Sequence, residues 1–205
     1  MSSVMETSLP ELQENGLGPE TATEPVGLYE VIEGQVREKP QMGAYESVLA
    51  NVLKKWLDKI VESNQLGQAF TEVLFLIDRE TKLQLRPDVA FVTAERWPLD
   101  RRPPRGKAAW EIIPDLAVEV ISPTNRTLDD FMKIHQYFHA GVRLVWMVLP
   151  SVDQVYVFHS PTKIQVLGRG NTLEGGSVVP GFQVDLNDLF GNEEVTDPKK
   201  AQPGP

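Results

Sequence analysis

Hydrophobic residues between Ala44 and Val61 recur at intervals of three and four positions. They are Val48, Leu49, Val52, Leu53, Trp56, Leu57 and Ile60. This spacing places them on one side of an α-helix, because a helix returns to the same face after about 3.6 residues. The segment is therefore predicted to be an amphipathic helix.

Two extended hydrophobic runs follow this helix. The first, Ala69–Ile77, is separated from the second, Leu83–Val92, by the polar segment Asp78–Thr81. Runs rich in Val, Leu, Ile and Phe on either side of a polar turn are typical of a β-hairpin. We predict a hairpin over residues 69–92.

The pattern over residues 115–149 indicates a strand, a helix and a second strand. Asp115–Ile121 is almost wholly apolar, a helix is predicted over Thr127–His139, and Gly141 is placed to end it. Val142–Leu149 is apolar at nearly every position, as in a strand covered on both faces. The connection is long enough to join parallel strands. The predicted fold class is α/β, with a mixed central sheet flanked by helices.

The remaining segments indicate a second hairpin and two tails. Gln154–His159 and Lys163–Gly168 alternate between apolar and polar residues, as hairpin strands do. Residues 1–24 and 191–205 contain few large apolar groups, so we expect a disordered acidic N-terminal tail and a flexible C-terminal tail. One domain is expected over residues 25–190.

Composition excludes several classes of protein. The 205 residues include no cysteine, which excludes disulfides, thiolate metal sites and a cysteine nucleophile. No apolar run approaches the roughly 20 residues that span a bilayer, and no signal peptide pattern is present. We expect a cytoplasmic protein that makes no use of a membrane.

The net charge of −9 is unevenly distributed. Seven acidic residues precede the first basic one, Arg37, so the rest of the chain is nearly neutral. A basic run then occurs within twelve positions and consists of Arg96, Arg101, Arg102, Arg105 and Lys107. This run fits either a loop that contacts nucleic-acid phosphates or a solvated loop that its prolines keep open.

Two acidic residues lie in otherwise apolar strand segments. Glu119 lies between Val118 and Val120, and Asp88 is followed by Val89. A carboxylate in such a segment needs a partner, because burying it alone costs several kcal/mol. The pair is consistent with a shared magnesium site. Alternatively, Asp88 caps a strand end and Glu119 pairs with a buried base such as Arg86.

Helical periodicity divides the second predicted helix into two sides. Its apolar side is expected to comprise Leu128, Phe131, Met132, His135 and Phe138, with His135 as a core histidine. Lys133 falls nearly opposite, level with Asp129 and Tyr137. Periodicity alone thus predicts an exposed Lys133 paired with Asp129.

Several short motifs together resemble those of a known family. They are Pro87-Asp88, Glu119-Val120-Ile121-Ser122-Pro123, Asp129 to Lys133 with Tyr137, Gly141-Val142, Trp146 and Val179-Pro180-Gly181-Phe182. From about Tyr29 to Phe190 the chain resembles the Uma-two family, which is restriction-endonuclease-like and belongs to the PD-(D/E)xK nuclease superfamily. A restriction-endonuclease-like fold is what this resemblance implies.

The resemblance also implies a metal-dependent nuclease. Asp88 and Glu119 would be ligands of Mg²⁺ or Mn²⁺, and Glu46 would be a third ligand from the start of the first helix. Glu46 has an ordinary alternative role, as a carboxylate favoured by the dipole at a helix N-terminus. The implied partner is DNA, and a homodimer through the side of the first helix that carries Trp56 would fit cleavage of both strands.

The catalytic lysine of the superfamily is missing from its usual strand, where this chain has Ile121. The resemblance implies that Lys133, on the following helix, takes its place, with Lys107 as the fallback. Two functions remain open. One is a metal-dependent endonuclease acting on DNA, and the other is a catalytically silent relative that serves as a binding or assembly module.

Overall fold

The structure, a computed structural model, describes residues 27–122 and 127–191. The two predicted tails lie outside the described residues, apart from Gly191. Within the part that is described, no helix has the length and apolar character needed to cross a bilayer.

A six-stranded sheet forms the centre of the molecule, in the order β10-β9-β8-β7-β6-β3. Its strands are β3 (Gly67–Thr71), β6 (Val89–Thr93), β7 (Leu116–Val120), β8 (Leu144–Leu149), β9 (Gln154–Ser160) and β10 (Lys163–Leu167). β7 and β8 are parallel, as the strand–helix–strand pattern predicts, and the other neighbours are antiparallel. The predicted mixed sheet is confirmed.

A smaller sheet with the order β2-β1-β5-β4 lies beside the large one. Its strands are β1 (Tyr29–Ile32), β2 (Gln35–Glu38), β4 (Phe75–Asp78) and β5 (Leu83–Leu85). The hairpin predicted over residues 69–92 is therefore divided between two sheets: its inner strands β4 and β5 pair in the small sheet, and its outer strands β3 and β6 pair in the large one. The breaks fall near Glu72, which has φ of 52°, and at Pro87, which has no N–H to donate.

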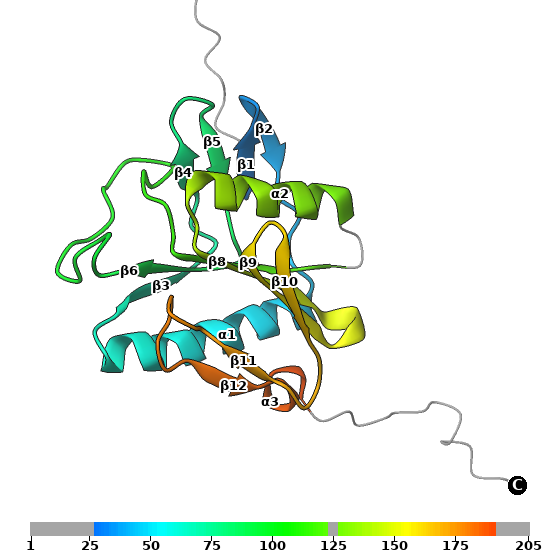
Figure 1. Ribbon diagram of the computed structural model, residues 1–205. Helices are drawn as coiled ribbons and strands as arrows, with labels where there is room; N and C mark the ends of the chain where they lie inside the picture. The colour runs from blue at the N-terminus through cyan, green and yellow to red at the C-terminus, as the bar shows by residue number, and fades with distance from the viewer. Residues whose placement is uncertain (1–26, 123–126, 192–205) are drawn as a thin grey trace, which may run out of the picture.

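The two long helices cover opposite faces of the large sheet (Figure 1). They are α1 (Ala44–Ser63) and α2 (Thr127–Ala140). The predicted apolar side of α1 is confirmed except at Val48, which is exposed: Leu49, Leu53 and Leu57 are buried against the sheet. α1 thus forms one hydrophobic core with the sheet, and α2 covers a second core on the other face.

Strand alternation decides which residues face α2. Leu116, Val118 and Val120 of β7 belong to the core under α1, whereas Ala117 belongs to the core under α2. Successive side chains of a strand point to opposite faces. Glu119 consequently faces α2.

The C-terminal elements complete the side of the molecule that carries α1. They are the short 3₁₀ turn η1 (Pro150–Val152), the two-stranded sheet of β11 (Thr172–Glu174) and β12 (Gln183–Asp185), and α3 (Leu186–Phe190). Leu173, Phe182 and Leu186 are fully buried in the α1 core. The hairpin predicted from 154 to 168 is confirmed as β9 and β10.

Candidate functional site

Asp88 and Glu119 lie opposite each other at one end of neighbouring strands. β6 pairs with β7 so that Val89 faces Val118, and Asp88 immediately precedes β6. One further step along this antiparallel register brings Asp88 opposite Glu119. Both residues are buried, and both line one pocket of about 340 Å³. The structure thus brings the two predicted ligands together.

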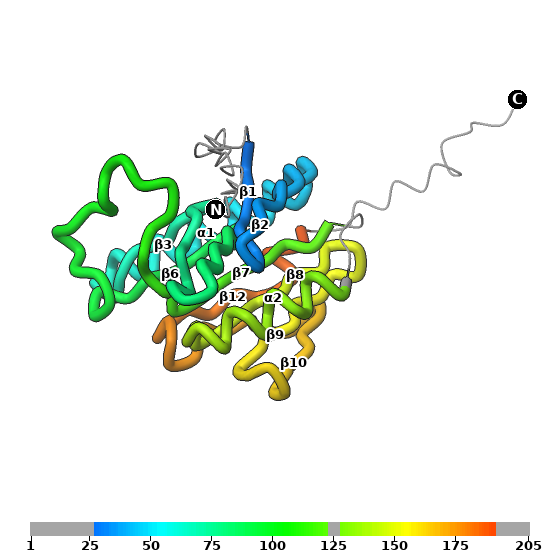
Figure 2. The backbone as a smooth tube through the Cα atoms, turned by 90° about the horizontal axis from the view of Figure 1, so that it is seen from above, coloured from blue at the N-terminus to red at the C-terminus, as the bar shows by residue number. Residues whose placement is uncertain are grey.

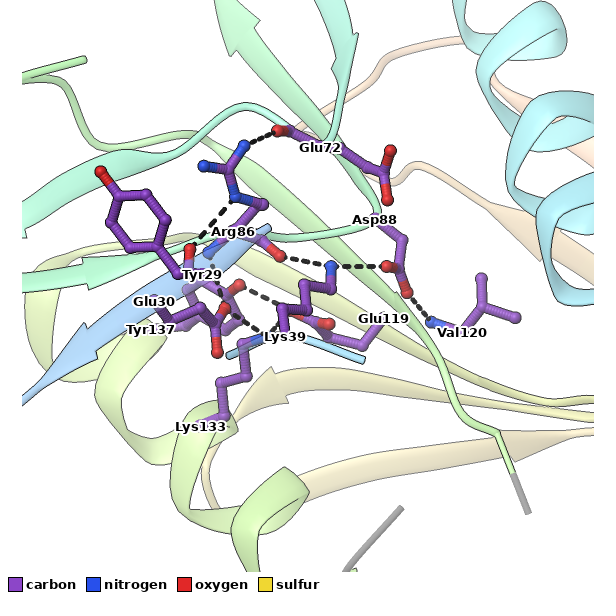
Figure 3. A network of polar contacts seen from close by, with 10 residues as sticks. All are labelled: Tyr29, Glu30, Lys39, Glu72, Arg86, Asp88, Glu119, Val120, Lys133 and Tyr137. Carbon is purple, nitrogen blue, oxygen red and sulfur yellow. Dashed lines mark hydrogen bonds and ion pairs between the residues drawn. The ribbon is translucent and has the colours of Figure 1, made fainter. Parts of the chain in front are cut away.

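Each oxygen of Asp88 has its own partner (Figure 3). Oδ2 accepts a hydrogen bond of 2.6 Å from the backbone N–H of Val120 on the neighbouring strand. Oδ1 lies 2.6 Å from the Nζ atom of Lys39, which also donates to the carbonyl oxygen of Arg86. Asp88 therefore both caps a strand end and forms a buried ion pair.

Lys133 joins two carboxylates from different sheets. Its Nζ atom lies 2.7 Å from Glu30 Oε1, on β1, and 3.0 Å from Glu119 Oε1, on β7. The hydroxyl of Tyr137, one turn further along α2, donates to the same oxygen of Glu119 at 2.6 Å. Figure 3 shows these side chains converging between α2 and the sheets. The ammonium of Lys133 thus bridges the small sheet and the large one.

The orientation of α2 differs from the one that periodicity predicts. Leu128 and Met132 are 74% and 55% exposed, and His135 is exposed, so the expectation of a core histidine is wrong. The fully buried residues are Ile134 and Tyr137. Phe131 and Phe138 pack against the core under α2 as predicted, but Lys133 also faces inward, where the buried charge of Glu119 needs a partner.

Lys133 and Arg86 also have partners other than those expected. Lys133 pairs with Glu30 and Glu119 rather than with Asp129. The guanidinium of Arg86 donates to the carbonyl oxygens of Tyr29 and Glu72 and does not contact Glu119. The buried base that compensates Glu119 is thus a lysine of α2.

Burial and neighbouring charges set the protonation of this cluster. Burial raises the pKa of Glu119 to about 7, although Lys133 and Lys39 oppose the rise. Burial acts to lower the pKa of Lys133, but Glu119 and Glu30 outweigh it and hold that pKa above its ordinary value. Burial, followed by the charge of Glu119, raises the pKa of Tyr137 well above its usual value. Lys133 and the Tyr137 hydroxyl therefore keep their protons at neutral pH.

The donor chemistry of the pocket fits a hard divalent cation. Acidic side chains outnumber basic ones in its wall: Arg37, Lys39 and Lys133 stand against Glu30, Glu38, Asp88, Glu119, Asp129 and Asp130. Carboxylate oxygen is the preferred ligand of Mg²⁺ and Mn²⁺, and Mg²⁺ commonly takes one or two such groups together with water. Among the described residues, no group of three acidic or histidine side chains is close enough to bind one ion. A site in this pocket would use two protein carboxylates.

Glu46 does not join the other predicted ligands. It lies in the first turn of α1, close to Gly43, and is not part of the pocket wall. This position fits its alternative role as an acid near the positive end of a helix dipole.

The basic run lies at the other end of the strands. It belongs to the connection that leaves β6 after Thr93 and enters β7 at Leu116, whereas Asp88 and Glu119 lie at the opposite ends of those strands. Its members have diverse contacts: Arg96 forms an ion pair with Asp115, Lys107 with Glu111, and Arg101 stacks over Trp97. The structure does not bring Lys107, the fallback for the catalytic lysine, to the carboxylates.

Sequence analysis missed Glu30 and Lys39, which the β1–β2 hairpin supplies. In Figure 2 this hairpin lies beside α2, in agreement with the ion pair between Glu30 and Lys133. A signal for it exists in the sequence. Glu33-Gly34 separates two short alternating segments, and both residues have positive φ, at 54° and 73°, as the favoured two-residue hairpin turn requires.

Comparisons with known proteins agree with this architecture. A family model named Uma2 and described as "Putative restriction endonuclease" matches residues 21–187. The fold also matches a crystal structure from Anabaena variabilis ATCC 29413, described as "a putative nuclease belonging to DUF820". That match has a TM-score of 0.69 at 19% sequence identity and covers 79% of this chain and 89% of the other.

A search of the curated proteins finds no match. The family match extends over most of the chain and includes the strands and the helix that carry Asp88, Glu119 and Lys133. This family is the one that the sequence motifs resemble. The chain is therefore a member of the Uma2 family, the restriction-endonuclease-like family of that description.

Proposed function

We propose that the protein is a metal-dependent endonuclease that hydrolyses phosphodiester bonds in DNA with Mg²⁺ or Mn²⁺. One observation carries the proposal: Asp88 and Glu119 lie opposite each other on adjacent strands, and both line the pocket that Lys133 also lines. Family membership supports the reaction class.

Asp88 and Glu119 would hold the cation. A divalent ion bound by two carboxylates and water would polarise a phosphate and lower the pKa of an attacking water. The backbone N–H of Val120 fixes Asp88, and the hydroxyl of Tyr137 fixes Glu119. Both carboxylates are thus held in place before substrate arrives, which reduces the cost of reorganisation during the reaction.

Lys133 would act through its charge. Because Glu119 and Glu30 hold its pKa above the ordinary value, its ammonium is protonated at neutral pH and cannot accept a proton from water. A fixed positive charge in a pocket partly shielded from solvent stabilises the negative charge that develops on a phosphate. Glu30 positions Lys133 through a second ion pair with its Nζ atom, at 2.7 Å.

A plasmid-nicking assay tests this function. The wild type with Mg²⁺ or Mn²⁺ should convert supercoiled plasmid to nicked circles, and Asp88→Asn and Glu119→Gln should each lower the rate at least a hundredfold. Glu174→Gln is the matched control, because Glu174 is an exposed acid on β11, far from the pocket in sequence and fold. The proposal fails if the wild type shows no activity beyond that of Asp88→Asn.

A catalytically silent binding module is the second candidate. What favours it is that lysine side chains already neutralise both Asp88 and Glu119. Calorimetry with Mn²⁺ separates the two functions. An endonuclease should give saturable heat that Glu119→Gln abolishes, whereas a silent module should give none and should bind its partner equally well after that substitution.

A further inference from the structure

Lys39 occupies an unusual position for a lysine next to a proposed metal ligand. Its Nζ atom lies 2.6 Å from Asp88 Oδ1, and the two side chains are only 9% and 3% exposed. The same Nζ atom donates to the Arg86 carbonyl oxygen at 2.6 Å. This ammonium is therefore withdrawn almost completely from water and bound to one carboxylate oxygen.

That oxygen is the one a cation would need. The other oxygen of Asp88, Oδ2, accepts the backbone N–H of Val120, which ties it to the neighbouring strand. Oδ1 is thus the oxygen of Asp88 that is not tied to the neighbouring strand, and Lys39 already binds it. Mg²⁺ binds oxygen ligands at roughly 2.0–2.1 Å, and it strongly repels another positive charge so close by. Lys39 and the ion exclude each other from Oδ1.

We infer that Lys39 is an internal counter-ion that occupies the cation position on Asp88 and leaves it when a divalent ion binds. The inference rests on the proposed function, because it assumes that Asp88 is a metal ligand. Lys133 stays in place, since its contacts are with Glu119 and Glu30. The site thus contains one exchangeable lysine and one fixed lysine.

The side chain of Lys39 can leave without unfolding the hairpin. Its backbone N–H donates to the carbonyl oxygen of Leu28 at 2.8 Å, and this bond does not involve the ammonium. The pocket next to it has a volume of about 340 Å³. Lys39 lines this pocket, so a change of rotamer that moves Nζ away from Asp88 has space to enter. Ion binding must first displace Lys39. The apparent association constant for the ion is therefore the intrinsic constant multiplied by the fraction of molecules in which Oδ1 is free.

The first test compares Lys39→Met with Arg37→Met by Mn²⁺ calorimetry. Arg37 also lines the pocket, but it is exposed and forms no ion pair within the described part of the chain. Both substitutions remove one positive charge, so Arg37→Met measures the general electrostatic effect. Because ion binding no longer has to break the charge-assisted hydrogen bond between Lys39 and Asp88, we expect Lys39→Met to bind Mn²⁺ at least about tenfold more tightly than the wild type. Arg37→Met should differ from the wild type by only about twofold to threefold.

A second measurement uses the wild type and does not depend on how the variant folds. Lysines are acetylated briefly with and without saturating Mn²⁺, and the modified positions are quantified by mass spectrometry. Lys39 should be protected in EDTA and become several-fold more reactive with Mn²⁺. Lys133 should stay protected in both conditions, and the exposed Lys55 gives the reactivity of a free lysine.

The outcomes distinguish this inference from the proposed function. Saturable Mn²⁺ binding with Lys39 still protected, or Lys39→Met that binds no more tightly than Arg37→Met, overturns the inference alone. Saturable binding with release of Lys39 but no DNA cleavage supports the inference and overturns the endonuclease. The complete absence of Mn²⁺ binding overturns both.

Discussion

At the scale of single residues, Glu119 combines burial with an exchangeable proton. Its pKa is raised to about 7, first by burial, while Lys133 and Lys39 keep it from rising further. A proton and a metal ion compete for the same carboxylate oxygens, and ligands must lose their protons before an ion binds. The affinity of the metal site proposed above is therefore expected to depend on pH near neutrality.

We predict that Mn²⁺ affinity falls as the pH drops below about 7, by up to about tenfold per pH unit, and levels off above it. Calorimetry between pH 5.5 and 8, repeated in buffers of different ionisation enthalpy, measures both the affinity and the proton release. About one proton should be released per ion at pH 6 and almost none at pH 8. An affinity that stays constant over this range would contradict the prediction.

One member of the basic run, Arg96, has a structural role, because it forms an ion pair with Asp115. This carboxylate is buried, forms ion pairs with Arg96 and Arg143, and accepts the backbone N–H of Thr93. It therefore joins the start of β7 to the end of β6. Removing a partner of a buried carboxylate is costly because the remaining charge stays desolvated.

Arg96→Met should accordingly lower the free energy of unfolding by about 1–3 kcal/mol, because Asp115 loses a charge-assisted hydrogen bond. Arg102→Met is the matched control from the same run, since Arg102 is exposed and has no ion-pair partner among the described residues. It should change stability by less than about 0.5 kcal/mol. Urea denaturation compares the two. Equal effects would show that the ion pair with Asp115 contributes nothing.

At the scale of elements, the β1–β2 hairpin carries Glu30 and Lys39 into the site, and its turn determines their register. Gly34 has φ of 73°, and a Cβ atom added there would meet nothing within 4 Å. The cost of a substitution is therefore conformational rather than steric. Asn tolerates this backbone region better than other residues with side chains.

Gly34→Ala should thus destabilise the protein by about 1–2 kcal/mol, and Gly34→Asn by clearly less. Chemical denaturation of the two variants gives the comparison directly. If both variants are equally destabilised, the strain of a positive φ is not the cause.

The sequence alone predicts the helices and strands in which the hydrophobic residues are also the buried residues. The periodicity of α1 and the two strands predicted within residues 115–149 match the structure, because most of their apolar residues face the core. The divided hairpin over residues 69–92 was not predictable from pattern, since apolar alternation does not show which sheet a strand joins. The short β1–β2 hairpin was missed for two reasons. Its strands have only four residues each, and every residue of β2 is exposed, so β2 has no apolar pattern to detect.

The candidate site was predictable in part. The carboxylates at 88 and 119 stand out because they interrupt apolar strands, but nothing local connects them to Glu30 or Lys39. For Lys133 the pattern was misleading: the buried side of α2 contains a lysine and a tyrosine, while Leu128 and Met132 face outward. Hydrophobicity cannot reveal that a polar residue is buried to compensate another buried charge.

At the scale of the whole molecule, the pocket and the basic run lie at opposite ends of β6 and β7. DNA is long enough to contact both regions, and each phosphate that the protein neutralises releases counterions. The salt dependence of DNA affinity therefore distinguishes a run that contacts DNA from a solvated loop.

If the run contacts DNA, replacing Arg101, Arg102 and Arg105 together by Gln should weaken DNA binding. The slope of log affinity against log salt should become shallower by about 0.9 for each phosphate that the protein no longer neutralises. Fluorescence anisotropy between 50 and 300 mM salt measures this slope. An unchanged slope would identify the run as a solvated loop, and Mn²⁺ binding should be unaffected in either case.

The polar cluster draws on residues that lie far apart along the chain, from Glu30 on β1 to Tyr137 on α2. Synthesis proceeds from the N-terminus, so a ribosome that has made the first hundred residues has joined Glu30, Lys39 and Asp88 to the chain but neither Glu119 nor Lys133. A nascent chain thus lacks the acid and the base that complete the cluster until α2 has emerged. A translation product that ends before Lys133 would therefore lack part of the cluster, and it should not show the hydrolytic activity proposed above.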